Sequence, residues 1–88
     1  MGFLENAGKT IGALARAMGD YEAARQQAEY LLTMSEDQAR LRLHEKARQD
    51  RDPVILMSRA LKEIARSESG DRADLAARLA LFADGLVS

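Results

Sequence analysis

The sequence predicts an all-α fold, a small bundle of four or five short helices that forms a single helical domain over residues 1–88. Residues that enter helices at little cost, chiefly alanine, leucine, arginine, glutamate and glutamine, fill the 88-residue chain. No alternating run of apolar and polar residues indicates a strand, and the chain holds 1 proline. Apolar residues make up 47% of the chain, too many for a disordered protein. We expect helix over more than about 70% of the residues, against the usual third.

The first predicted helix spans residues 3–18. An apolar stripe at three- and four-residue spacing marks it, formed by Leu4, Ala7, Ile11, Leu14 and Met18. Gly19 and Asp20 then predict a helix end and an N-cap, so that a second helix follows over residues 21–33. Apolar residues of the two segments also share a seven-residue spacing. One long, bent helix through Gly19 is therefore the alternative.

Ser35 begins the third predicted helix, which spans about residues 36–50. Gln38 follows Ser35 by three residues, a spacing typical of a capping box. The apolar face of this segment is narrow. Leu41 points nearly opposite to it, where exposure and burial are equally expected.

Aspartates mark the starts of the last two predicted helices. Asp52 followed by Pro53 predicts an N-cap and a first helical position for a helix over residues 53–66. Asp71 is the expected N-cap of the final helix, over residues 72–84. The apolar faces of these two helices predict a core that includes Leu61, Ile64, Leu79 and Phe82.

Charge is unevenly spread along the chain, although the formal net charge is only -1. Residues 40–66 hold eight basic and four acidic side chains, whereas both flanking segments are net acidic. The candidate binding site is a basic patch on the outer faces of the third and fourth predicted bundle helices. It would contact phosphate or an acidic protein surface. Its residues are Arg40, His44, Arg48, Arg51, Arg59, Lys62 and Arg66. The alternative is a solvated face balanced by Glu36, Glu45 and Glu63.

Gly8 and Gly12 lie about one helical turn apart beside the apolar stripe of the first predicted helix. Small residues at this spacing let a second helix approach closely, and the alternative interpretation is a frayed N-terminus. The chain is short and contains no cysteine, so no disulfide reinforces a marginal core. We therefore expect a homodimer or larger assembly. Its candidate contact residues are Leu4, Gly8, Ile11, Gly12, Leu14 and Met18.

No pattern in the sequence predicts catalysis, a cofactor or a metal ion. Gly8-Lys9-Thr10 matches the last residues of a phosphate-binding loop, but the earlier glycine and the preceding strand are missing. His44 is the single histidine, and its neighbours one turn away are basic or aliphatic. No nucleophile–base pair accompanies it. We expect a protein that is not an enzyme.

These features predict a protein that acts by binding another macromolecule, as an adaptor, a regulator or a self-associating protein. The alternative is a nucleic-acid-binding regulator that uses the basic residues of 40–66. A helix-turn-helix is disfavoured because Asp71, Asp74 and Asp84 would meet the polyanion on the last helix. No segment approaches the ~20 apolar residues of a membrane span, and the start lacks a secretory pattern. We expect a cytoplasmic protein whose arginine- and alanine-rich composition suits a GC-rich bacterial genome.

Overall fold

The computed structural model describes residues 19–88, and helix accounts for 87% of this part of the chain. These residues form four helices and no strand. The all-α prediction and the expected helix content are therefore confirmed for the described residues.

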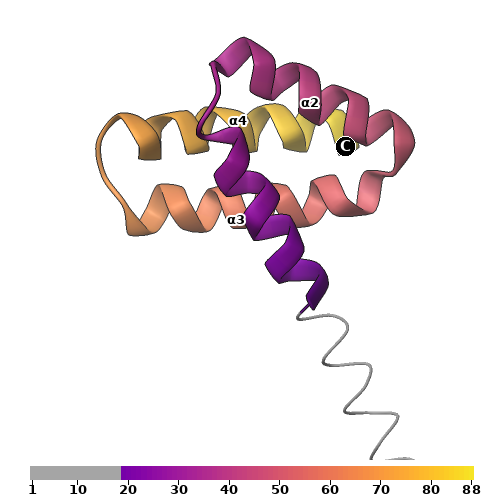
Figure 1. Ribbon diagram of the computed structural model, residues 1–88, viewed down its shortest axis with the longest axis horizontal. Coiled ribbons are helices and arrows are strands. Elements are labelled where there is room, and N and C mark those ends of the chain that lie inside the picture. Colours follow the sequence, from indigo (N-terminus) through magenta and orange to yellow (C-terminus); the bar gives the residue numbers. More distant parts are fainter. Residues whose placement is uncertain (1–18) are drawn as a thin grey trace, which may run out of the picture.

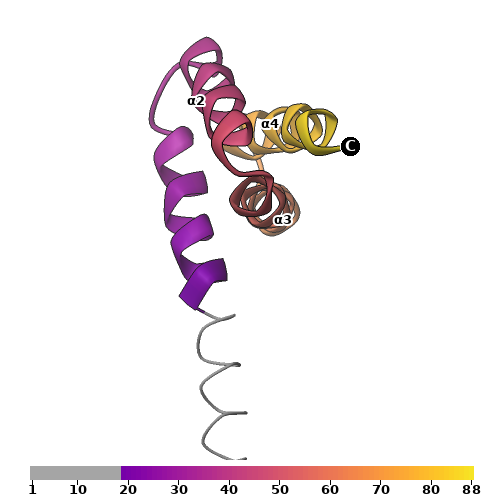
Figure 2. The same cartoon turned by 90° about the vertical axis from the view of Figure 1, so that its right-hand side faces the viewer.

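The helices pack as an antiparallel pair with two further helices laid against it. α3 (Arg51–Ser67) and α4 (Asp71–Val87) lie side by side, and α2 (Glu36–Gln49) runs along α4. The first described helix, over residues 19–31, crosses the pair at a steep angle (Figure 1). Seen along α3 and α4, this helix lies beside α2 and α3 (Figure 2). We call it helix 19–31.

The core lies where these four helices meet, and alanine supplies much of it. The large side chains that are fully buried are Leu43, Val54, Leu61, Ile64 and Leu79. Between them lie Ala24, Ala28, Ala39, Ala60, Ala76, Ala80 and Ala83. Small side chains let the helix axes approach closely, so that the leucines and Ile64 interlock across the interfaces.

The core prediction is confirmed for Leu61, Ile64 and Leu79, each 0% exposed, and wrong for Phe82. Phe82 is half-buried at the flank of α4 that faces α2, where the Arg40 guanidinium carbon lies 5.2 Å from its ring centroid. Ala83 occupies the inward position instead. Successive residues on a helix point about 100° apart, so one position decides which of the two is buried.

Ser35 caps α2 as predicted. Its backbone is extended (φ -64, ψ 155), and its hydroxyl oxygen accepts a hydrogen bond from the backbone N–H of Gln38 at 3.3 Å. This contact satisfies one of the N–H groups that a helix start leaves without an intrahelical partner.

The predicted cap at Asp52 is wrong, because α3 begins two residues earlier. Asp50 is the N-cap, and its carboxylate accepts from the backbone N–H of Asp52 at 3.1 Å. Pro53 still lies within the first turn, where a missing N–H costs no intrahelical bond. Asp50 also ends α2, its own N–H donating to the carbonyl of Lys46 at 2.8 Å.

The predicted caps at Asp71 and Asp20 are also wrong. Asp71 is the first helical residue of α4, and Gly70 precedes it with φ 96 and ψ -164. Those angles are open essentially only to glycine, so the turn was set by Gly70 rather than by an acidic cap. Gly19 and Asp20 are both helical, so Asp20 is not an N-cap. Whether residues 3–33 form one helix or two lies outside the described residues.

Candidate protein-binding groove

The structure places two members of the predicted basic patch, Arg40 and Lys62, on different flanks of α4. Arg40 reaches one flank, over Phe82, while its guanidinium pairs with Glu36 at 2.8 Å. Lys62 reaches Asp84 at 2.7 Å. Phe82 and Asp84 are two positions apart on one helix, so their side chains point about 200° apart. Arg40 and Lys62 therefore face different directions.

The remaining members of the patch differ in their surroundings. Arg51 donates to the carbonyl oxygen of Val87 at the end of α4. Arg66 faces a small cleft shared with Arg25 and Glu63, between α3 and helix 19–31. His44, Arg48 and Arg59 are exposed, and within residues 19–88 they form no salt bridge.

Acidic side chains join several of the basic residues to neighbouring helices. Glu36 accepts from Arg40 and, across the α2–α4 interface, from Arg78 at 3.0 Å. The hydrogen bond from Arg78 is the main cause that lowers the pKa of the Glu36 carboxyl below its ordinary value. Lys62 in the same way is the main cause of a lowered pKa at Asp84. These contacts tie the bundle together, so part of the basic charge is structural.

Ser58, Lys62 and Asp84 form a polar cluster in which the Ser58 hydroxyl donates to the Asp84 carboxylate. Ser58 is 2% exposed, so its oxygen has no path to a substrate. The cluster instead satisfies a buried hydroxyl, which would otherwise destabilise the α3–α4 interface. In the part of the chain that the structure describes, no three acidic or histidine side chains lie together as a metal site.

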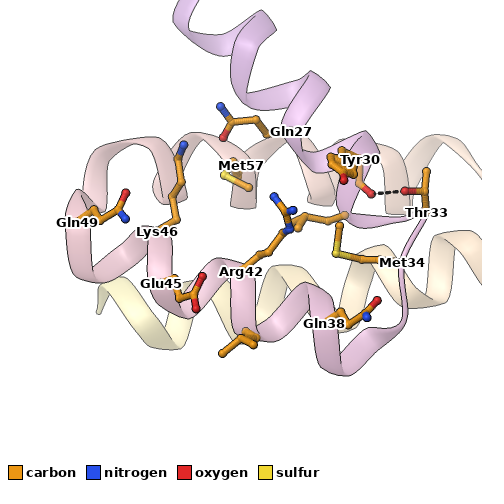
Figure 3. A pocket seen from close by; sticks show the side chains of 12 residues that line it. Gln27, Tyr30, Thr33, Met34, Gln38, Arg42, Glu45, Lys46, Gln49 and Met57 are labelled. Atoms are coloured by element: carbon orange, nitrogen blue, oxygen red, sulfur yellow. Dashed lines mark hydrogen bonds between the residues drawn. The ribbon is translucent and has the colours of Figure 1, made fainter.

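Helix 19–31 and α2 diverge from their connection and leave an open groove of about 920 Å³ between them. α3 closes its floor through Met57 (Figure 3). Its lining residues are Gln27, Tyr30, Leu31, Thr33, Met34, Gln38, Leu41, Arg42, Glu45, Lys46, Gln49 and Met57.

Large apolar side chains form the floor of this groove and part of both its walls. Met57 is 3% exposed and Leu31 2% exposed, so the floor is continuous with the core. Tyr30 stands at the rim with 52% of its surface exposed, and Leu41 is 59% exposed. The Thr33 hydroxyl donates to the carbonyl of Tyr30 at 2.7 Å, which fixes the end of helix 19–31 beside the groove.

Arg42 and Lys46 give the α2 wall of the groove a positive charge. Both rise from α2 towards helix 19–31, whereas Glu45 turns away from it (Figure 3). The Arg42 guanidinium carbon lies 4.9 Å from the ring centroid of Tyr30, a distance at which a cation and an aromatic face attract. Neither cation forms a salt bridge with another residue of 19–88.

Sequence reasoning missed this groove because it depends on how two helices diverge. Tyr30 and Arg42 belong to different helices and come together only in the fold. One signal was present: Leu41 on the polar side of its helix, which the structure shows to be exposed. The predicted self-association residues from Leu4 to Met18 lie outside the described residues.

No known family model, curated protein sequence or solved structure matches this chain. Among the helices of residues 19–88, none combines the length and apolar character needed to cross a membrane.

Proposed function

We propose that this chain is a non-enzymatic protein-binding module and that the groove between helix 19–31 and α2 is its docking surface. One observation carries the proposal: exposed Tyr30 and Leu41 border a groove whose floor contains Met34 and Met57. Exposed large apolar side chains beside a concave surface are typical of protein interfaces, in which aromatic residues and methionine are enriched. The unbranched methionine side chain adapts to the shape of a partner.

The dispersal of the basic residues favours a protein partner over nucleic acid. A nucleic-acid site needs cations along one continuous surface that follows the phosphates. Here Arg40 and Lys62 lie on opposite flanks of α4, and each is paired with a carboxylate. The groove, in contrast, collects apolar and polar side chains on one concave surface.

Affinity capture from a lysate of the source cells, with and without nuclease treatment, tests the proposal with three baits. They are the wild-type chain, Leu41→Asp in the groove, and Leu81→Asp as a matched control on α4. Leu81 is 73% exposed and does not line the groove. We expect a protein that wild type and Leu81→Asp retain and that Leu41→Asp loses. Retention by all three baits refutes the groove as the docking surface, and capture that nuclease abolishes supports the nucleic-acid alternative.

Self-association remains part of the proposed function. The apolar stripe from Leu4 to Met18, with Gly8 and Gly12 beside it, supports a homodimer in the cytoplasm. A core built largely of alanine buries little area per residue, which leaves the single chain with a modest apolar driving force. Sedimentation equilibrium at micromolar concentration checks this proposal, and a strictly monomeric mass refutes it.

A further inference from the structure

We infer that the groove receives an acidic segment of a protein partner, with a large apolar side chain seated on the floor and carboxylates on the α2 wall. This inference rests on the proposed docking surface and adds the chemistry of its occupant. Two sets of contacts support it, one apolar and one charged.

The apolar set defines where the segment is anchored. Leu31 and Met57 are nearly closed to solvent at the base, and Met34 packs against the same core. Burying one large side chain of a partner on this floor would remove apolar surface from water on both sides. Tyr30 then covers one flank of that side chain, as a rim residue does beside a central anchor, and Leu41 adds exposed apolar lining on α2.

The charged set defines the sign of the charge that the partner segment carries. Arg42 and Lys46 are four residues apart on α2, so their attachment points lie about 5–6 Å from each other along one face. The Tyr30 ring supports the Arg42 guanidinium, which reduces the side-chain entropy lost when it binds a carboxylate. No carboxylate of residues 19–88 pairs with either cation, so a carboxylate of the partner would meet charge that the described residues leave unneutralised.

The polar residues of the walls complement these two sets. Gln27, Gln38 and Gln49 line the groove from helix 19–31 and from both ends of α2. Their amides offer donors and acceptors that satisfy the main chain of a bound segment. A basic segment would instead meet Arg42 and Lys46 with like charge, which costs affinity and excludes it.

Selection from a phage-displayed random peptide library tests this inference. Peptides are selected on the wild-type chain and depleted on Leu41→Asp, and the enriched sequences are made as fluorescent peptides. We expect glutamate and aspartate to flank a large apolar residue in them. Their affinity, measured by fluorescence anisotropy, should fall about tenfold or more for the double variant Arg42→Glu, Lys46→Glu.

The double variant Arg48→Glu, Arg59→Glu is the matched control, because it changes the net charge equally at exposed positions outside the groove. We expect it to retain the peptides within about twofold, with circular dichroism showing equal helix content in both variants. Wild-type binding should also weaken as salt increases, which tests the charge without any substitution.

The outcomes separate this inference from the proposed function. Enriched peptides that lack acidic residues but need Leu41 overturn the acidic occupant and leave the docking groove standing. Peptides that bind both double variants as tightly as wild type have the same consequence. A library in which no peptide prefers the wild type to Leu41→Asp overturns both proposals.

Discussion

The α3–α4 pair and helix 19–31 enter the same core through different kinds of contact. Between α3 and α4, Leu61, Ile64 and Leu79 are fully buried, with several alanines between them. Helix 19–31 contributes only one large buried side chain, Leu31. The small side chains of Ala24 and Ala28 are buried beside it, and polar contacts at the surface add to them: Tyr21 and Arg25 contact Glu63, and Glu29 contacts Arg72.

This difference in contacts predicts that the helices of the bundle differ in the free energy needed to open them. A fully buried leucine or isoleucine contributes about 1.5–3 kcal/mol, whereas an exposed ion pair contributes about 0–1 kcal/mol. We therefore expect helix 19–31 to open at a lower free energy than α3 and α4. Because helix 19–31 is one wall of the groove, we expect this wall to open more readily than the part of the floor that Met57 of α3 provides.

Truncating a core leucine tests this order with the largest expected effect. Leu79→Ala should lower the global free energy of unfolding by about 2–5 kcal/mol, since it leaves a cavity between helices. Leu31→Ala should instead reduce hydrogen-exchange protection in helix 19–31 more than in α3 and α4. Urea denaturation measures the first effect, and amide exchange followed by NMR measures the second. Equal loss of protection in all helices after Leu31→Ala contradicts the comparison.

Gly70→Ala probes the turn that joins α3 to α4. An added Cβ meets no atom within 4 Å, but the φ of 96 is strained for any residue with a side chain. We expect a loss of about 1–3 kcal/mol in chemical denaturation. Gly85→Ala, at an exposed helical position without steric conflict, is the control and should not destabilise the protein. An unchanged free energy of unfolding in Gly70→Ala would show that the turn accepts a side chain without strain.

Asp50→Ala tests the start of α3 against the sequence-based prediction. Its carboxylate caps the helix, so its loss should cost about 1 kcal/mol. Asp52→Ala removes only a favourable charge from the first turn and should cost about half as much or less. Urea denaturation of both variants at neutral pH compares them, and a larger loss for Asp52→Ala would restore the cap predicted from the sequence.

The smallest expected effects are those of pH. Low pH weakens a contact between α3 and α4, and high pH weakens a contact of helix 19–31. Lys62 lowers the pKa of Asp84, so this contact stabilises α3–α4 at neutral pH and is lost as the pH falls through the lowered pKa. Glu63 raises the pKa of Tyr21, so that contact is present below about pH 10 and is lost as the pH rises further. Each effect should stay below about 1 kcal/mol at these exposed positions.

Two conservative variants isolate these contributions. Asp84→Asn should flatten the acid side of the stability profile, and Tyr21→Phe should flatten the alkaline side. Urea midpoints measured from pH 3 to pH 11, roughly the span of the two side-chain classes, provide the readout. An alkaline limb that is unchanged in Tyr21→Phe shows that the Glu63 contact does not hold helix 19–31.

The fold class followed from composition and spacing, because helix formers and apolar stripes are local properties of the chain. The start of α2 was predictable as well, since Ser35 and Gln38 act within one turn. The start of α3 was not, because Asp50 and Asp52 are equally good caps and only the packed structure selects Asp50. Phe82 was placed in the core because its flanking position beside Arg40 depends on where α2 lies.

The basic patch shows the same limit at the level of a surface. The sequence correctly predicted that Arg48 and Arg59 are exposed on outer helix faces. It could not predict that α4 would separate Arg40 from Lys62, because that depends on the order in which three helices pack. The contact between Tyr30 and Arg42, which marks the groove, is likewise tertiary.

Asp50 ends α2 and begins α3, so no spare residue lies between the two helices. Inserting or deleting a single residue at this junction would turn α2 about its axis by about 100° relative to α3. Ala39 and Leu43 would leave the core, and Arg42 would swing away from Tyr30. A change of chain length at this corner therefore requires the whole α2 wall to be rebuilt, whereas a substitution at an exposed groove position does not.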